Sequence, residues 1–153
     1  MPATLSTPTL SLEAAKVALA ASEAKARALQ IPMNIAVVGA STHLLHFSRM
    51  DGAKLTSISI AIDKAFTAAG HRAPTSIYKE QVWPGGAAYG IGKSNGGRFM
   101  TIAGGVPVRG KDGELLGAVG CSTGTPAQDE EVARAGVEAV ERFVREGGGR
   151  AKL

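Results

Sequence analysis

The sequence has little cysteine, few aromatic residues and no long apolar run. Its single cysteine, Cys121, excludes an internal disulfide and a zinc site made of cysteines alone. No apolar run approaches the ~20 residues that a membrane-spanning helix needs. The first ten residues also lack the charged and apolar regions of a signal peptide. These absences predict a cytoplasmic protein without a membrane partner.

The charge pattern lacks a basic cluster, because the basic residues are scattered along the sequence. The net charge is +4, but no basic stripe alternates with aromatic residues in the way that single-stranded nucleic acid requires. We therefore expect no nucleic-acid partner. The 153 residues, of which 44% are hydrophobic and 20% charged, suit one globular domain. We expect a leader over residues 1–10, the domain over 11–146 and a flexible tail over 147–153.

Hydrophobic periodicity and turn residues predict three helices and five strands. The helices are expected over residues 11–30, 55–70 and 126–146. The strands are expected over 34–38, 43–48, 98–103, 104–108 and 114–121. Between them, 71–97 is expected to be mostly loop, with a short helical turn near 76–82. Because strands follow one another in runs, the pattern favours an α+β fold with an antiparallel sheet and flanking helices.

The stretch 101–129 combines a hairpin, a glycine turn and a helix start. Asp112-Gly113 between two apolar runs is a hairpin signal. Thr125 and Pro126 then supply a cap and a first helical residue. Such a helix start offers free N–H groups to an anion, although most capped helix starts hold only their own cap.

Three further charged groups are candidates for binding or proton transfer. Arg49 can grip a carboxylate or propionate with two parallel hydrogen bonds, or it can simply pair with Asp51, which then caps the following helix. Lys64 can hold an anion or be an ordinary exposed helical lysine. Asp129, beside the glycine turn, is a candidate acid or base.

The three histidines supply no metal cluster by their spacing. His43 and His46 are three positions apart on a strand, which places them on opposite faces. Together with His71, these histidines are compatible with three roles, namely one haem ligand, one general base, or ordinary surface histidines. The glycines of residues 85–97 match neither phosphate-binding motif.

Several segments resemble the GlcG/HbpS family of haem-binding-like proteins, which includes the C-terminal domain of PduO-type proteins. The resemblance covers about residues 9–145. The matching segments are His43-Leu44, Arg49-Met50-Asp51-Gly52-Ala53, Lys64-Ala65 with Thr67, Gly104-Gly105-Val106-Pro107-Val108, Leu116-Gly117-Ala118-Val119-Gly120, and Gly124 with Gln128-Asp129-Glu130 and Ala133.

The resemblance implies a five-stranded, profilin-like antiparallel sheet with flanking helices, assembled into a homo-oligomer. It also implies a tetrapyrrole or small anionic ligand in a pocket around the Arg49–Ala53 and Gly104–Val108 segments. Under this hypothesis haem is bound non-covalently, because no CxxCH motif is present. His43 is then the metal ligand, Arg49 the propionate partner, and Gly104 and Gly105 part of the cofactor site.

A second hypothesis is a cofactor-free isomerase, hydratase or deaminase of small-carboxylate catabolism. Arg49 would orient the substrate, while Asp51, Lys64 or Asp129 would move protons. A third hypothesis is an accessory oligomer without a ligand. The chain departs from its relatives at Gly39, where they usually have aspartate, so a pocket shaped by that aspartate would differ here. We expect the segments at Arg49–Ala53, Lys64, Gly104-Gly105 and 122–124 to converge, within one chain or between chains.

Overall fold

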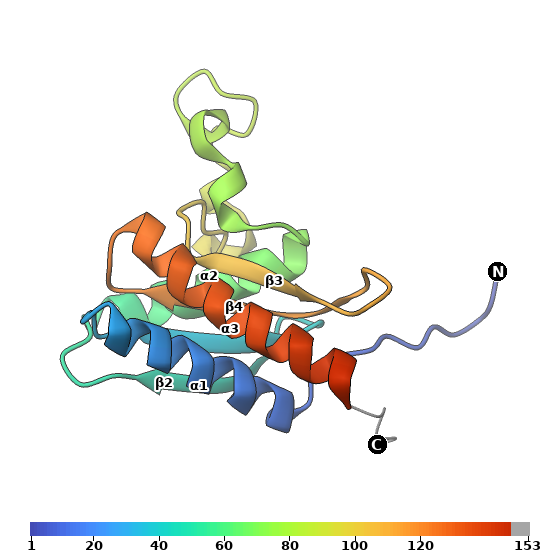
Figure 1. Cartoon of the computed structure of the whole chain (residues 1–153). Coiled ribbons are helices and arrows are strands. Elements are labelled where there is room, and N and C mark those ends of the chain that lie inside the picture. The colour runs from blue at the N-terminus through green and yellow to red at the C-terminus, as the bar shows by residue number, and fades with distance from the viewer. Residues whose placement is uncertain (148–153) are drawn as a thin grey trace.

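A computed structural model describes residues 1–147 and shows an α+β fold with a four-stranded sheet between helices (Figure 1). The tail predicted from residue 147 lies, except for Gly147, outside the described residues. In chain order, the helices and strands are α1 (Leu12–Ala28), β1 (Asn34–Gly39), β2 (Leu44–Arg49), α2 (Ser57–His71), β3 (Gly105–Arg109), β4 (Leu115–Ser122) and α3 (Pro126–Glu146).

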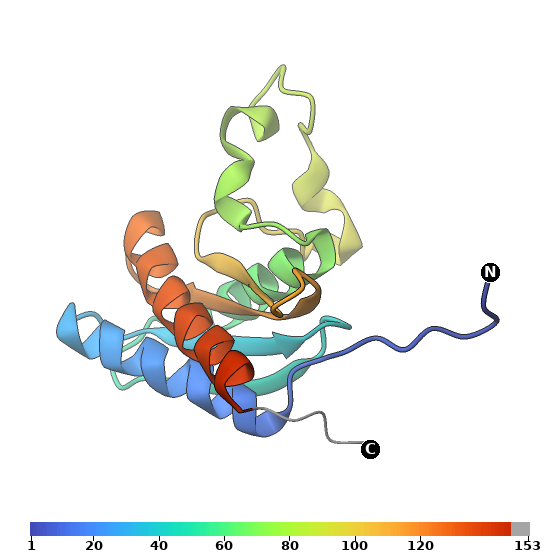
Figure 2. The same cartoon turned by 45° about the vertical axis from the view of Figure 1, so that its right-hand side comes forward.

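The sheet has the order β2-β1-β4-β3, and all neighbouring strands are antiparallel. Helices α1 and α3 cover one face, whereas α2 covers the other (Figures 1 and 2). The larger apolar cluster lies under α1 and α3 and includes Ile35, Val37 and Val119. The antiparallel sheet, the three helices and the hairpin at Asp112-Gly113 are therefore confirmed.

The prediction of a fifth strand over residues 98–103 is wrong. The main chain of this segment bonds to threonine side chains instead of a neighbouring strand. The Thr67 hydroxyl accepts from the Met100 N–H (2.8 Å), and its one proton lies between the Asp63 carbonyl (2.8 Å) and the Arg98 carbonyl (3.2 Å). The Thr75 hydroxyl donates to the Ile102 carbonyl at 2.7 Å. Because these groups are satisfied without a strand, the alternating apolar pattern here does not produce one. The likeness to profilin stays a prediction.

The long segment between α2 and β3 projects from the body of the molecule (Figures 1 and 2). It contains four short 3₁₀ turns, namely η1 (Thr75–Ile77), η2 (Lys79–Val82), η3 (Ile91–Lys93) and η4 (Asn95–Gly97). The helical turn expected near residues 76–82 is thus confirmed. At the base of the segment, His71, Tyr78 and Phe99 make mutual edge-to-face contacts.

Helix α2 packs unusually close to the sheet because small residues meet there. Ala61 and Ala65 lie over Gly120 of β4, where a Cβ atom would stand 2.1 Å from the Ala61 carbonyl oxygen. Leu55, two residues before the helix, stays outside this contact and is 70% exposed. The apolar part of the buried face of α2 is therefore made of alanines, namely Ala61, Ala65, Ala68 and Ala69.

Candidate functional site

Lys64 and Asp129 form a buried ion pair that joins α2 to α3. The Lys64 Nζ atom lies 2.7 Å from Asp129 Oδ2 and also donates to the Cys121 carbonyl at 3.0 Å. The two residues are only 1% and 3% exposed. The other oxygen, Asp129 Oδ1, accepts from the Gly124 N–H at 2.9 Å. Both charges therefore have protein partners, as a buried pair requires.

Gly104 provides the space that lets Lys64 reach a helix on the opposite face of the sheet. A Cβ atom at Gly104 would stand 2.8 Å from Lys64 Nζ and 2.7 Å from the Cys121 carbonyl oxygen, and its φ of +127° suits glycine. The structure thus brings Lys64, Gly104 and Asp129 together beside the turn at Ser122–Gly124. Neither Lys64 nor Asp129 lines either of the two surface depressions described below.

Cys121 is fully buried next to this ion pair. Burial raises the pKa of its thiol far above the ordinary range, and the Asp129 charge raises it further. Because the thiolate is the reactive form, Cys121 is an inert thiol in the folded protein.

We expect the folded protein at pH 8 to resist a thiol-specific chromogenic reagent for hours, because the Cys121 thiol is both buried and protonated. Absorbance would be followed with and without 8 M urea, and the unfolded chain should react with one equivalent within minutes. Rapid reaction of the native chain would contradict the burial described above.

Arg49 and Asp51 lie apart from the ion pair. Arg49 is the last residue of β2, and Asp51 follows it in the next turn. They line a depression of about 330 Å³ with Glu23 and Arg27 of α1. Both residues are exposed. Within one chain, the side chains of this segment therefore do not join Lys64 and Gly104 in a single pocket.

Asn34 links the two regions and was missed by the sequence reasoning. Its buried Nδ2 donates to the Lys54 carbonyl at 2.9 Å and to Thr123 Oγ1 at 3.2 Å. The loop after Arg49 is thereby fixed to the turn after β4. A buried asparagine at the head of an apolar strand is the sequence signal that could have identified it, since buried amides are normally hydrogen-bonded.

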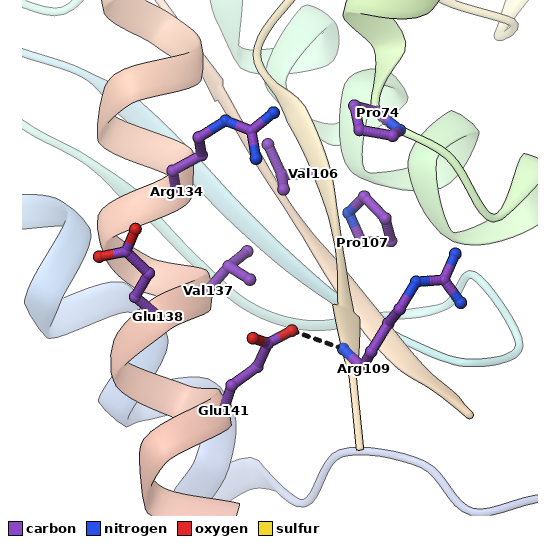
Figure 3. Close-up of a pocket in the computed structure, with 8 residues that line it drawn as sticks. All are labelled: Pro74, Val106, Pro107, Arg109, Arg134, Val137, Glu138 and Glu141. Carbon is purple, nitrogen blue, oxygen red and sulfur yellow. Dashed lines mark hydrogen bonds between the residues drawn. The ribbon is translucent and has the colours of Figure 1, made fainter. Parts of the chain in front are cut away.

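The Gly104–Val108 segment contributes to a second depression, of about 290 Å³, between β3 and α3 (Figure 3). Val106 and Pro107 line it on the strand side, and Val137 does so on the helix side. The Arg134 side chain reaches from α3 toward Val106 (Figure 3). The Arg109 guanidinium donates to the Arg72 carbonyl at 2.6 Å and to the Gly113 carbonyl at 3.1 Å, while the Glu141 carboxylate accepts from the Arg109 N–H at 2.9 Å. Gly104 and Gly105 are buried and do not line this depression.

His43 lies in the turn before β2 and is exposed. Its Nδ1 atom is 3.1 Å from the Ser41 hydroxyl, and no hydrogen bond to Nε2 occurs within residues 1–147. A single exposed histidine can act as an axial ligand for a haem iron. In the same described range, no group of three or more histidine, cysteine, aspartate or glutamate side chains is placed to hold a bare metal ion.

The four-stranded antiparallel sheet, with α1 and α3 on one face and α2 on the other, defines a small α+β domain. The model of the family described as "Haem degrading protein HbpS-like" matches residues 10–138. The chain belongs to this family.

Individual relatives agree with this assignment. A 15.0 kDa protein from the dhaT-dhaS intergenic region of Citrobacter freundii is 38% identical over 85% of this chain and 91% of its own length. The crystal structure of Klebsiella pneumoniae protein ORFY has a TM-score of 0.88 at 31% identity and covers 92% of this chain and 96% of its own. The crystal structure of a PduOC–haem complex has a TM-score of 0.81 at 31% identity, with coverage of 86% and 94%.

Among residues 1–147, no helix combines the length and apolar character that crossing a membrane requires.

Proposed function

We propose that this chain is a cytoplasmic homo-oligomer that binds haem non-covalently, with His43 as the iron ligand and Arg49 as a propionate partner. The observation that carries the proposal is the likeness to the PduOC–haem complex over 86% of this chain at 31% identity. Haem, when bound, supplies an iron atom capable of redox and ligand-binding chemistry.

The surroundings of His43 fit the role of an iron ligand. Ligating histidines usually bond through their second ring nitrogen to a protein group that fixes the ring. The Ser41 hydroxyl occupies that position at Nδ1 (3.1 Å), and Nε2 has no hydrogen-bond partner within residues 1–147. Leu44, the next residue, is 47% exposed and offers an apolar surface to a ring-shaped ligand.

The surroundings of Arg49 fit the binding of a propionate. Arg49 lines the exposed depression with Arg27, Glu23 and Asp51. Arg27 is paired with Glu23 at 3.6 Å, whereas Arg49 makes no ion pair within residues 1–147. A guanidinium binds a carboxylate with two parallel hydrogen bonds, so a free and exposed one is suited to the acidic edge of haem. The same depression would hold any other small anion.

The alternative of a cofactor-free carboxylate enzyme is not favoured by the site. Its proton-transfer candidates Lys64 and Asp129 are buried, bonded to each other and absent from the lining of both depressions. A general acid or base must come within hydrogen-bond reach of its substrate. Only Asp51 of that set is open to solvent.

Titration with haemin tests the proposal. We expect the wild-type chain to give a saturable Soret band, and the His43→Ala variant to bind at least tenfold more weakly. His71→Ala is the matched control, because His71 is also exposed and lies on a different element. Equal haemin affinity in wild type and His43→Ala would refute the assignment of the ligand.

A further inference from the structure

Leu44 and Phe47 of β2 project to the side of the sheet that α2 covers. They stand directly opposite Val38 and Ala36 of β1, and residues directly opposite each other on antiparallel strands project to the same side of a sheet. Val38 and Ala36 belong to the apolar cluster under α2. Both β2 residues therefore lie beside this cluster, on a strand at the edge of the sheet.

The bulge at the start of β2 separates these two residues from their neighbours. The register shift after Val37 leaves Leu45 without a partner on β1. Leu45 packs against the cluster under α1 and α3, and Val37, which stands opposite His46, belongs to that cluster. Leu45 and His46 therefore project to the α1 side, and the α2 side of residues 44–47 is entirely apolar.

Helix α2 extends the apolar surface next to β2. Ile62 packs against the same cluster as Phe47, and Ile58 lies one helical turn before it, on the same side of the helix. Leu44 is 47% exposed, and the other three side chains are half-buried. We call these four residues, Leu44, Phe47, Ile58 and Ile62, the α2–β2 face. Because β2 is an edge strand, no further strand lies beside it within residues 1–147.

The α2–β2 face lies between the two residues that the proposed function assigns to haem. His43 directly precedes Leu44, and Arg49 follows Phe47 by two positions. Along β2, an iron ligand, an apolar surface and a carboxylate-binding group thus follow one another. Haem has the same three parts, namely a central iron, an apolar ring and two propionates at one edge. This order favours haem as the occupant over a second copy of the chain, whose contact would need neither a histidine nor an arginine at its borders.

We propose that the α2–β2 face binds the porphyrin ring itself, so that the site takes tetrapyrroles with or without a metal. The free energy of burying apolar surface depends on the area removed from water and not on the iron. The bond from His43 to the iron is then a separate contribution to the affinity. The identity of the ligand rests on the proposed function, whereas the apolar face is a feature of the fold.

Metal-free protoporphyrin IX separates the ring from the iron, because it keeps the ring and both propionates and lacks only the metal. Its fluorescence would be followed while the chain is titrated in. We expect saturable binding by the wild type and an unchanged dissociation constant in His43→Ala, since no iron is present for the imidazole to bind. A wild type that binds haemin but not protoporphyrin IX would overturn the inference.

Leu44→Asn tests the face itself. The substitution removes apolar surface from a residue that is already 47% exposed, so the fold should be retained, and circular dichroism would check this. We expect the dissociation constant to rise roughly fivefold for protoporphyrin IX and for haemin. Leu12→Asn is the matched control, because Leu12 is 49% exposed and lies on α1, on the opposite side of the sheet. Equal affinities in Leu44→Asn and Leu12→Asn would contradict a ring-binding role for the face.

The same variants distinguish the remaining outcomes. If Leu44→Asn changes the sedimentation coefficient but not the porphyrin affinity, the α2–β2 face is a contact between copies and the inference fails. If porphyrin affinity depends on Leu44 while haemin affinity is indifferent to His43→Ala, the assignment of the iron ligand fails and the ring-binding face stands. If the wild type binds neither ligand, both the proposed function and the inference fail.

Discussion

Replacing Gly120 by alanine is expected to prevent stable folding or to lower the free energy of unfolding by about 3 kcal/mol or more. The new Cβ would lie 2.1 Å from the Ala61 carbonyl oxygen and 2.5 Å from the Ala65 nitrogen, both main-chain atoms of α2. No side-chain rotation relieves that contact, so the helix must move away from the sheet. Its alanine face, including Ala61 and Ala65, would then lose its packing.

Urea unfolding followed by circular dichroism would measure this effect. Gly147→Ala is the matched control, because no atom lies within 4 Å of a Cβ built there and its φ of 178° is outside the left-handed region. That variant should stay within about 0.5 kcal/mol of wild type. An unchanged urea midpoint in Gly120→Ala would show that α2 does not pack as closely as described.

Replacing Lys64 by methionine is expected to cost about 3–5 kcal/mol of unfolding free energy. The substitution keeps most of the side-chain volume but leaves the Asp129 carboxylate buried with only the Gly124 N–H as a partner. An uncompensated buried charge is far more costly than the ion pair it replaces. The variant should therefore unfold at a much lower urea concentration.

The double variant Lys64→Met with Asp129→Leu separates charge from packing. Because no charge then remains unpaired, we expect it to be more stable than Lys64→Met alone. Lys16→Met is the surface control, since the exposed Lys16–Glu13 pair contributes at most about 1 kcal/mol. If Lys64→Met were as stable as Lys16→Met, the buried pair would not be an important part of the fold.

Local patterns predicted most of the fold because each signal acts over a few residues. Thr125 and Pro126 form the expected capping box and first turn of α3. The segment 98–103 was misread because its apolar alternation does not reveal the hydroxyls of Thr67 and Thr75, which replace a neighbouring strand. That substitution depends on tertiary contacts across about thirty residues, which no local pattern contains.

The candidate site was predicted only in part, for a similar reason. The sequence singled out Lys64 and Asp129, but not that they would be buried together, because 65 residues separate them. Arg49 and Gly104 were predicted to share one pocket. Within one chain, however, Arg49 and the Gly104–Val108 segment lie beside separate depressions. Asn34, which connects these regions, gave no charge or motif signal.

The central claim is that His43 carries the iron of a bound haem, and rescue by free imidazole tests it most directly. The ferric Soret spectrum of the haemin complex would be recorded for wild type, His43→Ala, and His43→Ala with added imidazole. We predict that the substitution shifts and weakens the band, and that imidazole restores the wild-type spectrum by taking the place of the missing ring. A His43→Ala spectrum identical to that of the wild type, without imidazole, would contradict the account.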